Sequence, residues 1–154
     1  MRVTHFSCPI GTVEITEESG EITRITFLDT EPSINNASPV LIECKRQLSS
    51  YFTGERVEFN LPLNPLGTDF QKNVWKELQN IPFGKTISYM NLAKRLGDPK
   101  VIRAAGTANG KNPIAIIIPC HRVIGSDGSL TGYAGGLKRK QWLLEHESSQ
   151  TTLF

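Results

Sequence analysis

The sequence predicts two domains: a small α/β domain followed by a mostly helical domain. Three observations support this prediction. The first thirty residues alternate apolar and polar positions, as half-buried strands do. Two prolines within 61–65 resist both helix and central strand, so we expect a linker there. Three short helical stretches with glycine-containing turns follow this linker. We therefore expect an N-terminal support domain at 1–62 and a C-terminal domain at 66–150.

In the N-terminal domain, alternation over 12–16 and 22–27 predicts two strands, and the turn residues between them predict a β-hairpin with one buried face. The stretch 31–39 has the composition of a loop. Apolar positions within 40–52 fit one face of a helix, and Gly54 favours its end nearby. These elements would make a small sheet with one helix.

In the C-terminal domain, Thr68 predicts the N-cap of a helix over 69–78. A second helix over 88–96 and a third over 100–109, joined by a glycine-containing turn, have the pattern of a helix-turn-helix. Any corner of two packed helices gives the same pattern, so DNA binding does not follow from it alone. A last helix is predicted over 137–147.

The apolar run Ile114–Ile118 predicts a buried strand or extended segment that leads directly to Cys120. A thiol is a useful nucleophile only as a thiolate, and the imidazole of His121 could take its proton. Adjacent side chains of extended chain point to opposite sides, so we expect a water to bridge these two residues. Glu147 could then accept the other ring N–H. The alternative is a buried structural cysteine beside an incidental histidine.

Composition excludes several classes of protein. Of the 154 residues, 38% are hydrophobic and 21% are charged, as in ordinary globular proteins rather than disordered or fibrous ones. No run reaches the ~18 apolar residues of a membrane span, and the N-terminus lacks a signal-peptide pattern. We therefore expect a cytoplasmic protein without membrane contact, associated with the nucleoid if the source is prokaryotic. The three cysteines have no zinc spacing, so no disulfide framework, metal or cofactor is expected.

The charge is distributed unevenly along the chain. Residues 1–84 carry 7 Lys/Arg against 11 Asp/Glu, whereas residues 85–140 carry 10 Lys/Arg against 2 Asp/Glu. A basic block of this kind indicates a polyanion partner that meets one segment only. A solvated cationic face is an equally good interpretation of the charge alone.

Several motifs together give the chain a family resemblance. They are Gly67-Thr-Asp-Phe-Gln71, Ile81-Pro-Phe-Gly-Lys-Thr-Ile-Ser-Tyr89, Lys100-Val-Ile-Arg-Ala-Ala-Gly106, Asn112-Pro113, Ile118-Pro-Cys-His-Arg-Val123, Ser126-Asp-Gly128, Gly132-Tyr-Ala-Gly-Gly-Leu137 with Lys140, and Leu143-Leu-Glu-His-Glu147. The chain resembles the O6-alkylguanine-DNA alkyltransferases from Cys44 onward. This resemblance implies a ribonuclease H-like N-terminal domain and a C-terminal domain with a winged helix-turn-helix-like motif.

The resemblance also implies direct-reversal DNA repair. Cys120 would take a methyl or other alkyl group irreversibly from O6 of guanine, and from O4 of thymine, in one turnover without a cofactor. His121 would act as the water-mediated base and Glu147 would orient it. Tyr89 would donate to N3 of the flipped guanine, and the carbonyls of Cys120 and Val123 would receive the exocyclic amine of that base.

The implied partner is double-stranded DNA, bound through the minor groove by a monomer; cooperative binding along DNA is left open. Arg103 would fill the gap left by the flipped base, and Asn112 would tie the Pro-Cys loop to the recognition helix. A helix ~10–12 Å across meets a groove only ~6 Å wide, so small residues should form the contact. The further expected substrate- and DNA-binding positions are Ala104, Ala105, Gly106, Thr107, Ala108, Ser126, Tyr133 and Ala134.

Ala134 departs from the family pattern, because some members of the family have a serine there whose hydroxyl reaches O6. Two other functions compete with the transferase. A non-enzymatic sensor of alkylated bases would keep the DNA-binding residues without a reactive cysteine, and Cys120 argues against it. A transcription factor would need sequence-reading side chains where this helix has alanine and glycine.

Overall fold

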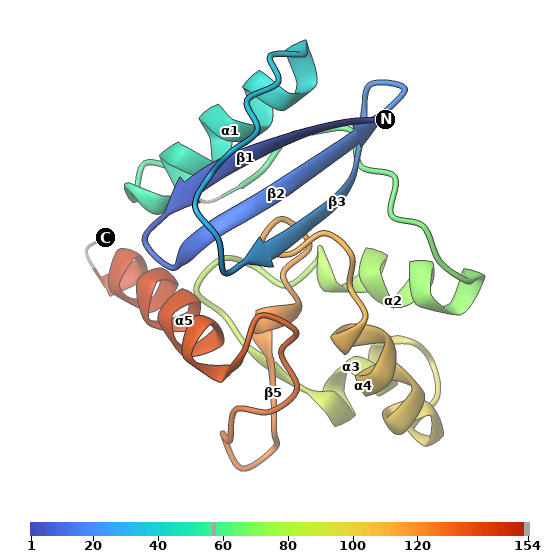
Figure 1. The fold of residues 1–154 in the computed structure, drawn as a ribbon. Coiled ribbons are helices and arrows are strands. Elements are labelled where there is room, and N and C mark those ends of the chain that lie inside the picture. Colours follow the sequence, from blue (N-terminus) through green and yellow to red (C-terminus); the bar gives the residue numbers. More distant parts are fainter. Residues whose placement is uncertain (57, 153–154) are drawn as a thin grey trace. The chain divides into compact units, whose positions relative to one another are not determined.

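The computed structural model of the protein describes residues 1–56 and 58–152 (Figure 1). No helix in these two ranges combines the length and the apolar character that crossing a membrane requires. The elements in chain order are β1 (Arg2–Cys8), β2 (Gly11–Glu18), β3 (Glu21–Leu28), α1 (Pro39–Phe52), α2 (Asp69–Leu78), β4 (Ile87–Ser88), α3 (Tyr89–Arg95), η1 (Pro99–Val101), α4 (Ile102–Gly110), η2 (Cys120–Arg122), β5 (Val123–Ile124) and α5 (Leu137–Thr152).

The chain forms two compact units, and the second is interrupted by a segment of the first. Unit 1 consists of residues 1–66 and 113–117, and unit 2 consists of residues 67–112 and those from Ile118 onward. The sequence suggests a single division near the proline pair. The structure adds a short return of the chain to unit 1 immediately before the segment that contains Cys120.

Unit 1 is built on an antiparallel sheet with the strand order β1-β2-β3. The predicted hairpin is β2–β3, and its two turn residues, Ser19 and Gly20, both have positive φ (53° and 81°), as a tight two-residue hairpin requires. β1 pairs with β2 along its whole length, although the sequence analysis names only two strands. The predicted helix forms as α1, which packs along the sheet through fully buried residues such as Leu41 and Leu48 (Figure 1).

The predicted linker forms hydrogen bonds with the edge of this sheet. The N–H of Ile22 in β3 donates to the carbonyl of Pro62, and the N–H of Asn64 donates back to the carbonyl of Ile22, both at 2.8 Å. Proline is compatible with such an edge because its carbonyl still accepts even though it has no N–H to donate. The segment before unit 2 is therefore bound to β3 rather than loose.

The prediction of a strand or extended segment over Ile114–Ile118 is wrong. One parallel bridge joins Ile114 to Ile25, after which the chain turns: the N–H of Ile117 donates to the carbonyl of Ala115 at 2.8 Å. Between them Ile116 has φ of 71°, which is rare for a β-branched residue and strained. The branched residues of this run are nevertheless buried, so the pattern indicated burial correctly and conformation incorrectly.

Unit 2 contains the predicted helices. α2 begins with a complete capping box, in which Thr68 accepts from the N–H of Gln71 and the Gln71 side chain accepts from the N–H of Thr68. Ser88 caps α3 through its side chain, which accepts from the N–H of Asn91. The third helix begins as the 3₁₀ turn η1 and continues as α4, which packs on α2 and α3. The short strands β4 and β5 pair in parallel, and this places the start of α3 beside the segment that follows Cys120.

Candidate active site

The segment that contains Cys120 enters unit 2 through a tight turn. Pro119 has φ −83° and ψ 62°, and the N–H of Cys120 donates to the carbonyl of Ile118 at 2.8 Å. These angles define an inverse γ-turn. The 3₁₀ helix η2 follows, in which successive side chains are about 120° apart because there are three residues per turn. Cys120, His121 and Arg122 therefore point in three directions, and all three are buried.

His121 and Glu147 lie together as expected. Nε2 of His121 is 2.8 Å from Oε2 of Glu147, which extends from α5, and both side chains are almost fully buried. Arg122 joins the same carboxylate, with Nε donating to Oε1 at 2.8 Å and Nη2 donating to Oε2 at 3.0 Å. The carboxylate thus has one imidazole partner and one guanidinium partner.

This arrangement determines the charge states. Burial acts to raise the pKa of Glu147, but His121 and Arg122 outweigh it and hold that pKa below its ordinary value. Burial, helped by the charges of Arg122 and Lys140, lowers the pKa of His121 although Glu147 opposes it. Glu147 is therefore ionised and His121 is neutral. Nε2 of His121 must carry the proton that is donated to Glu147. Nδ1 of His121 therefore keeps its lone pair, and within the described ranges this atom is buried without a protein hydrogen-bond partner.

The Cys120 thiol is protonated in the resting site. Burial raises its pKa to about 11, whereas a hydrogen bond with Asn112 and the charge of Lys140 act in the opposite direction. At 6% exposure the sulfur lies in a poorly solvated environment, which disfavours the thiolate unless a base removes the proton as the thiol reacts.

Two asparagines connect the end of α4 to this segment. Asn112 donates from Nδ2 to the carbonyl of Ile118 at 2.7 Å, the contact that the sequence analysis expects between the Pro-Cys loop and the recognition helix. Asn109, which the sequence analysis does not single out, donates to the carbonyl of Cys120 at 3.4 Å and is 1% exposed. Both ends of the Ile118–Cys120 turn are therefore held by α4 and the residues just after it.

Tyr89, at the start of α3, faces the loop before α5. Its hydroxyl donates to the carbonyl of Thr131 at 3.0 Å. Lys140, fully buried, donates to the same carbonyl at 2.7 Å and to the carbonyl of Val123 at 2.6 Å, and its Nζ lies 5.9 Å from the centre of the Tyr89 ring. The Val123 carbonyl that was expected to receive a guanine amine thus already accepts one hydrogen bond and has a second lone pair left.

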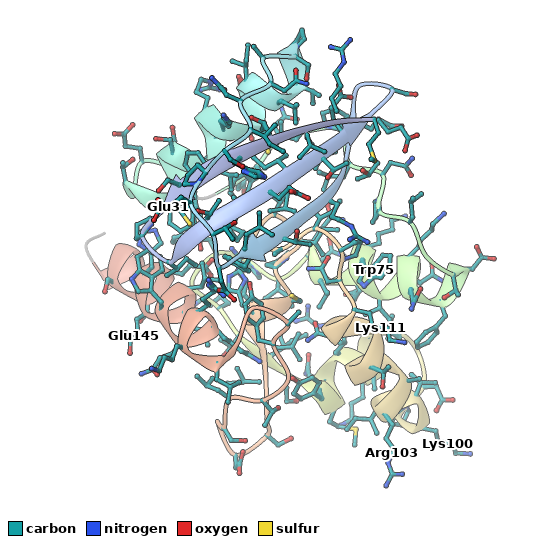
Figure 2. All side chains as sticks on the ribbon, viewed as in Figure 1. Glu31, Trp75, Lys100, Arg103, Lys111 and Glu145 are labelled. Atoms are coloured by element: carbon teal, nitrogen blue, oxygen red, sulfur yellow. The ribbon has the colours of Figure 1, made fainter. Side chains whose placement is uncertain are left out.

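The exposed face of α4 is narrower than the sequence suggests. Arg103, Ala104 and Thr107 are exposed, but Ala105 and Ala108 are buried at 0% and 2% exposure. Ala105 and Ala108 were expected among the small residues that contact DNA, but they pack inside unit 2 and do not belong to the exposed face of α4. Figure 2 shows Arg103 and Lys100 extending away from the unit at one end of α4.

Gly106 is intermediate in exposure and lies against Tyr89: a Cβ added there would be 3.6 Å from its ring. In the loops that flank α5 and β5, Ser126 and Ala134 are exposed whereas Tyr133 is buried. Across residues 1–56 and 58–152 no group of three or more His, Cys, Asp or Glu side chains is suited to hold a metal ion.

The sequence analysis missed Arg122, Lys140 and Asn109 as parts of the site. Lys140 precedes Glu147 by seven residues, so both lie on the same face of a helix, and this spacing could have placed Lys140 inward. Arg122 follows a buried apolar run by four residues, which was a weaker signal. Arg122 and Lys140 both belong to the basic block at 85–140, whose charges are interpreted from sequence as facing a polyanion.

Comparison with known proteins gives a consistent family. Residues 69–149 match the model of the 6-O-methylguanine DNA methyltransferase DNA-binding domain, and residues 1–65 match the model of the ribonuclease-like domain of the same family. The methylated-DNA-protein-cysteine methyltransferase of Methanosarcina acetivorans is 44% identical over 150 residues, covering 94% of this chain and 96% of that protein.

Solved structures agree with these matches. Mycobacterium tuberculosis O6-methylguanine methyltransferase has a TM-score of 0.88 at 42% identity, covering 99% of this chain and 98% of that one. The M. tuberculosis protein OGT in complex with DNA has a TM-score of 0.89 at 43% identity, covering 97% and 94% of the two chains. With both family models and near-complete relatives matched, the chain belongs to the methylated-DNA-protein-cysteine methyltransferase family.

Proposed function

We propose that this protein repairs alkylated DNA by transferring an alkyl group from O6 of guanine to its own Cys120. The observation that carries the proposal is the hydrogen bond of 2.8 Å between buried His121 and Glu147, directly beside the only cysteine of unit 2. This pair provides a neutral imidazole of fixed tautomer next to a thiol that needs a base. Membership of the family supports the same reaction.

The reaction proceeds by displacement at the alkyl carbon. The Cys120 thiol passes its proton, through a water, to Nδ1 of His121 as Sγ attacks the carbon. A C–S bond forms while the bond from that carbon to O6 breaks, and its electron pair leaves with guanine. Tyr89 donates a proton toward N3 of the departing base and regains one from solvent. The product is a thioether, which no group of the site can hydrolyse, so each molecule reacts once.

Tyr89 must change partners for this step. In the resting protein its proton is directed to the carbonyl of Thr131, which Lys140 also contacts. Because Lys140 also donates to that carbonyl, the hydroxyl can turn to guanine N3 without leaving the carbonyl unpaired. The carbonyls of Cys120 and Val123 are the acceptors proposed for the exocyclic amine.

The DNA is proposed to be double-stranded and bound through its minor groove by one copy of the chain. The exposed Arg103, Ala104 and Thr107 would enter the groove, with Arg103 filling the space of the flipped base. A relative has been solved in complex with DNA. The packing of α3, α4 and the β4–β5 pair supports a winged helix-turn-helix, and the sheet with α1 supports a ribonuclease H-like unit.

The second candidate, a sensor that binds alkylated bases without reacting, is not favoured, because it has no use for Cys120 beside a base. O4-alkylthymine is proposed as a second substrate of the same pocket. Neither proposal requires a metal or cofactor.

Transfer of a radiolabelled methyl group from O6-methylguanine duplex to the protein tests this function. The unchanged protein should take up label, and Cys120→Ser should not, since an alcohol is a much poorer nucleophile near neutral pH. Cys44→Ser is the matched control, because Cys44 is also buried but lies in unit 1, and it should take up label normally. Labelling of Cys120→Ser at the normal level would refute the assignment.

A further inference from the structure

Arg122 binds Glu147 with a geometry that surface ion pairs rarely have. Its Nε and Nη2 donate to the two carboxylate oxygens at 2.8 and 3.0 Å, the paired arrangement in which a guanidinium matches a carboxylate. Its remaining Nη1 donates to the carbonyl of Ile81 at 2.7 Å, and the Phe83 ring lies 5.8 Å from its Cζ. With three bonds and 7% exposure, this side chain is fixed in one position.

We infer that Arg122 is a positioning residue of the transfer reaction: by neutralising Glu147 it keeps His121 uncharged, with Nδ1 available for the Cys120 proton. The inference rests on the proposed function and deepens it. The carboxylate of Glu147 orients the imidazole, whereas Arg122 sets the charge of that imidazole.

The reason lies in the charges around the imidazole. A buried carboxylate whose only polar partner is an imidazole would be neutralised most easily by protonating that imidazole. Here Arg122 already supplies the positive charge, and Oε2 of Glu147 is shared between Nη2 of Arg122 and Nε2 of His121. The charged groups that act on His121 are Glu147, Arg122 and Lys140. A proton on His121 would leave this buried group with two uncompensated positive charges.

The consequence for catalysis concerns the lone pair of Nδ1. An imidazolium carries protons on both ring nitrogens, so it cannot accept the thiol proton. Without Arg122, His121 would hold a proton at neutral pH and the base would be lost. The low-pH limb of the transfer rate should then move toward higher pH, in the same direction as the titration of the imidazole.

The test is nitrogen NMR of the full, unalkylated protein labelled on its three histidines, the two ring nitrogens of each being assigned first. The unchanged protein should show neutral His121 with the proton on Nε2 at neutral pH, and the imidazole should titrate below its ordinary pKa of 6.5. In Arg122→Met the titration should move upward by about 1–3 units. Arg122→Lys, which retains the charge, should stay close to the unchanged protein. Arg95→Met is the matched control, because Arg95 is an exposed arginine of the same unit whose contacts are with Glu77, at 3.9 Å, and with the side chain of Asn91.

An imidazolium in the unchanged protein at neutral pH would overturn the inference. So would an unmoved titration in folded Arg122→Met, or a raised one in Arg122→Lys. If Arg122→Met does not fold, the double variant Arg122→Met/Glu147→Gln, which leaves no unpaired buried carboxylate, should keep His121 neutral, and a raised titration there would also refute the role. Methyl transfer is measured on the same samples. Absence of transfer in the unchanged protein contradicts the proposed function and leaves the NMR result standing.

Discussion

Cys44 and Cys120 are both buried thiols, but their surroundings differ. Burial, together with the neighbouring Glu43 carboxylate, raises the pKa of Cys44 to about 12. Burial also raises the pKa of Cys120, to about 11, but Asn112 and Lys140 act against it, and His121 follows in sequence. The difference in reactivity therefore comes from the neighbours of the thiol and not from its exposure.

At the scale of residues, the first prediction concerns pH. The pKa values of His121 and Glu147 in the folded protein lie below their ordinary values of 6.5 and 4.5. As the pH falls, the unfolded chain therefore binds these two protons before the folded one does. The free energy of unfolding should decline as pH falls below about 6.5, and more steeply below about 4.5, where the contribution of ionised Glu147 is lost.

Urea unfolding at a series of pH values measures this decline. His121→Asn should flatten the part that begins below about pH 6.5, and Glu147→Gln should flatten the part below about pH 4.5. A decline unaffected by either site variant would show that other groups cause it.

The sequence was sufficient to propose the reactive residues but not all of their partners. Cys120, His121 and Glu147 could be predicted because a thiol beside an imidazole has chemical meaning and because the motif is specific. Arg122 and Lys140 were harder to find, since a charged residue in a basic block is normally solvated, and the spacing of Lys140 from Glu147 and the apolar run before Arg122 were their only signals. Only the structure shows that both are buried against carbonyls and a carboxylate.

At the scale of elements, α4 combines two tasks. Its buried residues Ala105 and Ala108 pack in unit 2, and the carbonyl of Ala108 accepts from the indole N–H of Trp75 at 2.9 Å. Its other face carries exposed Arg103. The helix and its position were predictable from spacing and turn residues, but which alanines face inward depends on the neighbouring helices and not on the sequence of α4 alone.

Arg103→Ala should reduce repair of duplex DNA more than dealkylation of the free base. The reason is that the proposed role of Arg103 is to stabilise the flipped state, which the free base does not need. Rates on both substrates measure the ratio. Lys111→Ala, which removes another exposed cation beside α4, should leave the ratio unchanged (Figure 2). Equal losses on both substrates for Arg103→Ala would indicate a role in the fold or the pocket.

Thr68→Ala should lower the free energy of unfolding by about 1 kcal/mol, because the first turn of α2 loses a side-chain acceptor for one of its N–H groups. Thr68→Ser, which retains the hydroxyl, should be close to the unchanged protein. Urea unfolding at neutral pH compares the three. A Thr68→Ala protein as stable as Thr68→Ser would mean that the capping box contributes nothing.

The run Ile114–Ile118 illustrates where prediction at this scale fails. Four β-branched residues favour a strand, but the chain must return from unit 1 to unit 2 within a few residues, and it does so through successive tight turns. The cost is the strained backbone of Ile116. Such a requirement comes from the tertiary fold and leaves no local signal in the sequence.

At the scale of the whole molecule, the basic residues between 85 and 140 fall into a buried group and an exposed group. Of the ten cations between 85 and 140, Arg122 and Lys140 are buried and bind groups of the site. Most of the others, including Lys94, Lys100 and Lys111, are exposed. Composition therefore predicted a polyanion partner from a count that included two charges with an internal use.

The alkylated protein should melt several degrees below the unmodified one. Cys120 is packed at 6% exposure, and an added methyl group in a packed site typically costs ~1–3 kcal/mol. For a chain of this size each kcal/mol lowers the melting temperature by roughly 2–4 °C. Melting curves of the two forms measure the difference, and hydrogen exchange should show that η2 and α4 open first. Equal melting and equal protection would mean that the pocket accepts the methyl group without strain.

Mass spectrometry of the protein, after incubation with an excess of duplex that contains O6-methylguanine, tests directly whether Cys120 accepts the methyl group. We expect every protein molecule to gain one methyl group and no more, and fragmentation to place that group on Cys120 as a thioether. The DNA should contain one restored guanine for each modified protein. Restored guanine without a change in protein mass, or a methyl group on Cys8 or Cys44, would contradict the assignment of Cys120 as the acceptor.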